Sequence, residues 1–187
     1  MAVLAEALSV IVRLDSIKSK YKGGWDGFIN DIPNRTLCFD NEIARIGFMT
    51  PHDVKTYKDL LECKRLRFLY DDKAIDMAVV DQWTGLTTDC DWLEFGRFKY
   101  EKEGMISMCW YFDEPRDKGA GTYINDLSMR LATPHGWKYE GSLSQTSKFI
   151  RTQQLKENLK FLRREGGLDV YLDLKTRKEV FIGRTSK

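Results

Sequence analysis

The sequence is poor in the residues that most often build catalytic and metal sites. It contains only two histidines, His52 and His135, and four cysteines, none of which forms a Cys-x-x-Cys pair. This spacing supports neither a zinc knuckle nor a dithiol redox motif. We expect free, mostly buried thiols in a reducing compartment, and we predict no metal ion and no cofactor.

Long hydrophobic runs are also missing. No apolar stretch approaches the roughly 20 residues that a membrane-spanning helix needs. Residues 1–15 have no basic leader, and Glu6 and Arg13 interrupt their apolar stretch, which argues against a secretory signal peptide. We therefore expect a cytoplasmic protein without a membrane partner.

Sequence motifs of common catalytic, metal-binding and nucleotide-binding sites are absent as well. The chain has no Gly-x-Ser-x-Gly elbow, no His-Glu-x-x-His pair and no EF-hand pattern. Residues 119–122 (GAGT) lack both the third glycine of a dinucleotide loop and the Gly-Lys-Ser/Thr of a P-loop, so we predict a flexible connection there. These absences favour a binding protein over an enzyme.

The composition is that of a folded domain. The 187 residues are 42% hydrophobic and 31% charged, which is far from the disordered regime and enough for one substantial core. We expect an α+β core over residues 1–113 and a C-terminal elaboration of the same domain over residues 114–187.

The clearest local signal is a helix start at residues 50–53 (TPHD). Threonine suits the N-cap, proline the first helical position, and aspartate the positive end of the helix dipole. Apolar residues then recur at helical spacing, at Val54, Tyr57, Leu60 and Leu61. The sequence therefore predicts a helix over residues 51–64.

Most other periodic segments read as strands. These segments are 5–13, 36–39, 43–49, 66–70, 75–81, 92–100 and 105–112. Helices are expected over 17–21 and 25–32, over 123–131, and from residue 144 or 146 to 165, before a hairpin of 168–174 and 179–182. The predicted fold is α+β: a mainly antiparallel sheet with helices packed on one face, plus a C-terminal helix and β-hairpin.

Charge is distributed unevenly along the chain. Residues 71–94 carry seven acids against Lys73 alone, a net charge of −6, whereas residues 148–187 carry eleven Lys/Arg against five acids, a net charge of +6. Trp83 and Trp92 lie in the acidic segment, and aromatic anchors ringed by charge are typical of interaction hot spots. We predict that a basic protein partner is bound by Asp81, Gln82, Trp83, Asp89, Asp91 and Glu94.

Two alternative interpretations of the acidic segment stay open. Either tryptophan can belong to the core instead, and Trp92 more readily because it begins a predicted strand. The carboxylates can also gather around Mg²⁺ or Ca²⁺, although acids in a solvated turn are the commoner case.

The basic C-terminal third raises the question of nucleic acid. Lys156, Lys160, Arg163 and Arg164 fall on one side of the expected helix. Neighbouring glutamates dilute this patch and no nucleic-acid motif is present, so we expect a solvated face.

Three functions follow as hypotheses. The first is a non-enzymatic cytosolic binding protein of immunity or regulatory type that uses the acidic, tryptophan-bearing loop. The alternative is an enzyme acting on a small phosphorylated or nucleotide-like substrate, which uses His135 as acid or base, the loop of residues 119–121 and basic residues of the C-terminal third; it predicts a concave pocket that joins these segments. The third is a homo-oligomeric structural protein whose oppositely charged lobes meet across subunits.

Overall fold

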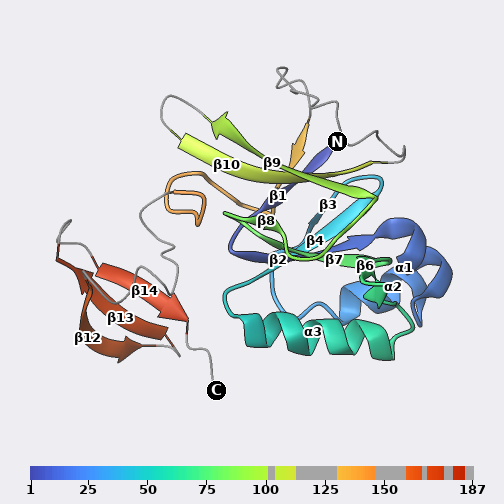
Figure 1. Ribbon diagram of the computed structural model, residues 1–187, viewed down its shortest axis with the longest axis horizontal. Coiled ribbons are helices and arrows are strands. Elements are labelled where there is room, and N and C mark those ends of the chain that lie inside the picture. The colour runs from blue at the N-terminus through green and yellow to red at the C-terminus, as the bar shows by residue number, and fades with distance from the viewer. Residues whose placement is uncertain (101–103, 113–129, 146–158, 166–167, 175–178, 184–187) are drawn as a thin grey trace.

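The chain folds into stacked layers of helices and two β-sheets. The computed structural model describes residues 1–100, 104–112, 130–145, 159–165, 168–174 and 179–183. Figure 1 shows the helices on one side of a five-stranded sheet and a four-stranded sheet on its other side. The fold is α+β with mainly antiparallel strands, as predicted. Among the described residues, no helix has the length and apolar character to cross a membrane.

The five-stranded sheet is antiparallel throughout and lies in the middle. Its strands, in spatial order, are β3 (Cys38–Phe39), β4 (Ile43–Phe48), β2 (Leu8–Arg13), β7 (Met77–Asp81) and β8 (Gly85–Leu86). Val10 of β2 lies opposite Ile46 of β4 and Val79 of β7. Both faces of this sheet are covered, which explains why β2 and β4 are nearly continuous apolar runs rather than alternating ones.

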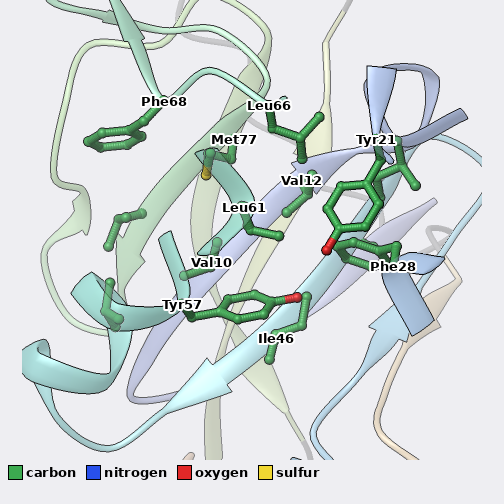
Figure 2. Close-up of a cluster of buried hydrophobic side chains, with 14 of the residues drawn as sticks. Val10, Val12, Tyr21, Phe28, Ile46, Tyr57, Leu61, Leu66, Phe68 and Met77 are labelled. Atoms are coloured by element: carbon green, nitrogen blue, oxygen red, sulfur yellow. The ribbon is translucent and has the colours of Figure 1, made fainter. Parts of the chain in front are cut away.

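Three helices cover one face of this sheet. They are α1 (Leu14–Lys20), α2 (Gly24–Asn30) and α3 (Pro51–Cys63). Figure 2 shows the cluster between helices and sheet, in which Tyr57 and Leu61 of α3 meet Val10, Val12 and Ile46. Helix α3 begins as predicted: the Thr50 hydroxyl oxygen accepts from the backbone N–H of Asp53 at 3.1 Å.

The four-stranded sheet packs on the opposite face. Its strands, in spatial order, are β11 (Leu131–Ala132), β1 (Ala2–Ala5), β10 (Gly104–Tyr111) and β9 (Leu93–Tyr100). β9 and β10 form the predicted antiparallel hairpin, and β11 is parallel to β1. Val3 and Cys109 pack here against Ile11 and Val80 of the five-stranded sheet. Trp137 and Tyr139 cover the outer face.

A sharp bend between β1 and β2 moves the chain from one sheet to the other. The prediction of one strand over residues 5–13 is wrong at Glu6 and Ala7, because Ala7 adopts a left-handed backbone with φ +50°. Gln82 holds this conformation with two hydrogen bonds. Its side-chain oxygen accepts from the Ala7 N–H at 2.7 Å, and its backbone N–H donates to the Ala7 carbonyl at 2.8 Å. Tertiary hydrogen bonds therefore override the strand propensity of the segment.

The segments predicted as strands over 66–70 and 75–81 bond to each other near the turn that joins them: the Ile75 N–H donates to the Phe68 carbonyl and the Asp76 N–H to that of Arg67, each at 3.0 Å. Residues 71 and 72 form the turn of a short hairpin between β5 (Leu69–Tyr70) and β6 (Lys73–Ala74). β7 leaves this hairpin and joins the central sheet beside β2.

The C-terminal segment forms a three-stranded antiparallel sheet. Its strands are β12 (Leu159–Glu165), β13 (Leu168–Asp173) and β14 (Glu179–Gly183). The hairpin of β13 and β14 is confirmed, whereas the predicted helix is wrong over residues 159–165, where pairing with β13 satisfies the backbone instead. The helix predicted over 123–131 is wrong at Leu131, which belongs to strand β11, and residues 123–129 and 146–158 of the predicted helices lie outside the described residues.

Candidate functional site

A cavity of about 870 Å³ opens beside the bend between β1 and β2. Its walls come from the bend at residues 6–7, the segment 33–36, the end of β4 and residues 53–60 of α3, and it is completed by Leu143 and residues 134–137. This volume is within the range of small-molecule sites. The cavity is the strongest candidate site in the described part of the chain.

Burial separates the deep end of the cavity from its entrance. Glu6, Ala7, Arg45, Phe48 and Tyr57 are buried lining residues and form the deep end. The exposed lining residues mark the entrance; they are Pro33, Asp53, Thr56, His135 and Gly136. Two buried charged residues that do not form an ion pair, Glu6 and Arg45, therefore line a cavity whose walls are otherwise largely apolar.

Arg45 is the most deeply buried charged group that lines the cavity. Its side chain is 2% exposed, and its Nε donates to Ser9 Oγ at 2.9 Å. Nη2 donates to the backbone carbonyl of Glu6 at 2.8 Å, and Nη1 donates to that of Thr36 at 3.3 Å. These three acceptors are neutral; burial lowers the pKa of the Arg45 guanidinium, and the nearby Glu6 and a hydrogen bond with Cys38 only partly offset this effect. In the described part of the chain, no carboxylate lies within 4 Å of it.

The neighbouring glycine makes room for this guanidinium. Gly47 follows Arg45 on the same face of β4, and a Cβ atom at Gly47 would lie only 2.5 Å from Arg45 Nη2. A side chain at this position would therefore force the guanidinium away from Ser9 and Thr36.

Glu6 connects the bend to the segment 130–145. Its Oε1 accepts three hydrogen bonds: from Trp137 Nε1 at 3.1 Å, from the Ser144 N–H at 3.0 Å and from the Ser144 hydroxyl at 2.6 Å. A fourth hydrogen bond to this segment comes from Gln82, whose Nε2 donates to the Leu143 carbonyl at 2.7 Å. These bonds hold one wall of the cavity against the two sheets.

Comparison with protein-family models, with curated proteins and with solved structures finds no match. The function therefore has to be argued from the geometry of the site itself.

His135 lies at the entrance of the cavity, in a turn where Gly136 has φ +73°. The enzyme hypothesis predicted a pocket that joins His135, residues 119–121 and basic residues of the C-terminal third; the cavity includes His135, but no Lys or Arg of the described residues 159–183 lines it, and the hypothesis stays a prediction. Residues 119–121 lie outside the described residues.

The predicted partner-binding residues do not share one exposed surface. Gln82 is 2% exposed and clamps the bend. Trp92 is 7% exposed, and its Nε1 donates to the Ala74 carbonyl at 2.9 Å, so it belongs to the core. Trp83 is half-buried, with the Arg97 guanidinium 4.3 Å from the centre of its ring.

The acids of this set differ in their surroundings. The Asp81 carboxylate accepts from the backbone N–H groups of its own turn, at residues 83 and 84. Asp91 is exposed and forms an ion pair with Lys73 at 2.6 Å, whereas Asp89 is exposed and Glu94 is half-buried on β9. The prediction that these residues bind a basic partner stays a prediction.

Sequence reasoning missed Arg45 and Glu6 as site residues. Both are charged residues inside apolar runs, at IARIGF over 43–48 and at AVLAEALSV over 2–10. Charged groups are rarely fully buried without a specific role, so a lone charge in such a run was the available signal.

Proposed function

We propose that the protein binds a small organic molecule in the cavity beside the bend between β1 and β2. The apolar part of the molecule packs against Phe48, Leu60 and Leu143, and its polar end meets Glu6 and Arg45. One observation carries this proposal: an open cavity of about 870 Å³ is lined by two buried charged residues.

The energetics of Arg45 support a ligand-binding role. Burying a cation without a carboxylate partner is costly, and an apolar residue would serve a purely structural core better. The left-handed backbone of Ala7 is a second local cost at the same place. Strained and desolvated groups cluster at binding and active sites, where the rest of the fold holds them.

A test is to fill the entrance of the cavity. A fragment set is screened by ¹H–¹⁵N NMR, and binding of the hits is then measured for Thr56→Trp, because Thr56 lines the cavity on α3. Asp59→Trp is the matched control, since Asp59 is exposed on the same helix and does not line the cavity. We expect hits that shift resonances of the lining residues, and at least about tenfold weaker binding in Thr56→Trp alone. Equal affinity in both variants, or no hit at the cavity, would rule out the proposal.

A chemical step on the bound molecule is a natural extension of this proposal. His135 at the entrance is favoured as its acid or base, because an imidazole titrates near neutral pH. If the protein is an enzyme, His135→Gln lowers turnover of a bound substrate while leaving its affinity within a few fold. Unchanged turnover in this variant would exclude the role.

The hairpin of β5 and β6, here called the acidic hairpin, supports a second candidate function, the binding of a basic partner. Its exposed aromatic side chain is Tyr70 on β5, which is 64% exposed, rather than the half-buried Trp83. A β-bridge between Lys73 and Asp89 brings Asp89 beside this hairpin, whose turn carries the exposed Asp71 and Asp72. Aromatic side chains ringed by charge favour protein contacts.

This second candidate is tested with an oligolysine peptide at low and high ionic strength. Salt-sensitive binding that is lost in Asp71→Lys/Asp89→Lys and kept in Asp59→Lys would support it, because exposed charges are screened by salt. Binding that survives the double charge reversal would remove it.

A further inference from the structure

We infer that the molecule held in the cavity carries an ammonium group, which binds the carboxylate of Glu6. This inference rests on the proposed function and specifies the chemical class of the ligand, a primary amine with an apolar body.

The charged residues that line the cavity favour a cation over an anion. Among the described lining residues, Glu6 and Asp53 are acidic, whereas Arg45 is the only lysine or arginine. Two acids against one guanidinium leave the lining with one negative charge in excess when His135 is neutral. An anionic ligand would add to this excess, whereas a cation compensates it.

The hydrogen-bond donors of Arg45 are largely taken up by the protein itself. Its nitrogens donate to Ser9 Oγ and to the backbone carbonyls of Glu6 and Thr36. The Cys38 thiol is a fourth hydrogen-bond partner. An anionic group of a ligand would therefore compete with acceptors that the fold already supplies.

Glu6, in contrast, keeps an acceptor free for a ligand. Its Oε1 accepts from Trp137 once and from Ser144 twice, whereas Oε2 accepts no hydrogen bond from the described residues. The Tyr57 hydroxyl also has no described partner, but it is enclosed by protein, and Glu6 Oε2 is not. A ligand that enters the cavity can therefore reach Oε2. An ammonium group has only donors, and a carboxylate has only acceptors, so the two match in hydrogen bonding as well as in charge.

The walls of the cavity fit the rest of such a ligand. Phe48, Tyr57 and Trp137 line the cavity, and aromatic rings attract an ammonium group over their faces. Leu60 and Leu143 add aliphatic surface. Moving an ammonium group out of water is costly unless an opposite charge receives it, which explains why its place is at Glu6 rather than elsewhere on these walls. The ligand class that fits is an aromatic or aliphatic primary amine, bound with its amine end inward.

The test compares three probes that share a phenyl body and differ in the charge of their polar end. Binding of 2-phenylethylamine, 2-phenylethanol and 3-phenylpropionate to the wild-type protein is measured by NMR titration at pH 7, where the amine is protonated. We expect the amine to shift resonances of the lining residues and to bind at least about tenfold more tightly than the other two probes.

The outcomes separate this inference from the proposed function. If the alcohol or the carboxylate binds in the cavity as tightly as the amine, the ammonium inference is wrong while the proposed function stands. If the amine shifts only resonances outside the cavity, or if none of the three probes binds, the inference fails as well. The fragment screen alone then decides the proposed function.

A variant pair assigns the preference to Glu6. Glu6→Gln should reduce the ratio of amine to alcohol affinity to about one, whereas Glu42→Gln should keep it, because Glu42 is exposed and does not line the cavity. Since Glu6 also holds the segment 130–145, Glu6→Gln is used only if its circular dichroism matches the wild type. Otherwise the side-chain carboxyl ¹³C resonance of wild-type Glu6 decides: it should shift with the amine and not with the alcohol, and equal shifts would refute the assignment.

Discussion

The hydrogen bonds of Glu6 predict how firmly the segment 130–145 is held. Oε1 of Glu6 accepts from Trp137 and twice from Ser144, over distances of 2.6–3.1 Å. The substitution Glu6→Ala removes all three bonds; the buried Ser144 hydroxyl then loses its described acceptor, and the Ser144 N–H keeps only its longer bond to Ser142 Oγ, at 3.3 Å. We expect local undocking of this segment before global unfolding, because few strand contacts hold it.

The size of the effect follows from the charge of the acceptor. A hydrogen bond to a charged group contributes about 1.5–3 kcal/mol, but bonds that share one oxygen are not additive. We therefore expect Glu6→Ala to weaken docking by about 3 kcal/mol. Glu6→Gln keeps a neutral acceptor and should cost about 1 kcal/mol. Because each 1.4 kcal/mol changes an equilibrium constant tenfold, 3 kcal/mol corresponds to an opening equilibrium constant about 100-fold larger.

Hydrogen exchange measures this opening directly at the Ser144 amide. Its N–H should exchange about 100-fold faster in Glu6→Ala and less than tenfold faster in Glu6→Gln. Glu42→Ala serves as the control, since the Glu42 side chain is exposed on the turn before β4. An unchanged exchange rate in Glu6→Ala would show that other contacts hold the segment, and would refute this reasoning.

Three further predictions concern stability and thiol chemistry. Burial alone raises the pKa of Asp76, but hydrogen bonds from Lys20 and Ser16 outweigh it and hold the pKa below its usual value. Its stabilisation is therefore present at neutral pH and is lost as pH falls below about 4 towards the folded pKa, so urea midpoints should fall less steeply with acid in Asp76→Asn than in the wild type. Thr50→Ala should lower the free energy of unfolding by about 1 kcal/mol in urea titrations, through loss of the N-cap bond. Because burial raises the pKa of Cys38 to about 11 and Cys63 is exposed, a disulfide reagent at pH 8 should modify Cys63 first and Cys38 only on unfolding; rapid modification of Cys38 in the native state would contradict its burial.

Elements with strong local signals could be predicted from the sequence. Helix α3 begins at Pro51 because the Thr50 hydroxyl accepts from the Asp53 N–H and donates to the Asp53 carboxylate, and both residues are visible in the sequence. The hairpin of β9 and β10 has a similar local origin, in two strand-like runs around a short connection. The helix expected over residues 159–165 failed because its leucine spacing is also compatible with a paired strand, and only the partner β13 decides between the two.

The candidate site was less accessible to sequence reasoning. Counting charges located the acidic segment, but charge alone does not report burial, so Gln82 was predicted to contact a partner although it packs inside. Arg45 donates to the carbonyl of Glu6, which lies 39 positions earlier in the sequence. This contact depends on the bend between β1 and β2, which the sequence around residues 6–7 does not predict. His135 was singled out because histidines are rare here, and its place at the cavity depends on the docking of residues 130–145.

The bend itself links these observations physically. Ala7 departs from the backbone preference of an alanine, and two interior polar side chains hold the bend: Gln82 bonds to Ala7, and Arg45 bonds to the carbonyl of Glu6. Removing one partner leaves buried donors unsatisfied, so this arrangement is more costly to build than a continuous strand with an apolar neighbour. Of the described non-glycine residues with a left-handed backbone, Ala7 lines the cavity beside the buried Arg45, whereas Arg65, Asp71 and Asp72 lie away from it. This concentration is the reason to look for a ligand there rather than at the solvated acidic hairpin, where each charge obeys ordinary surface chemistry.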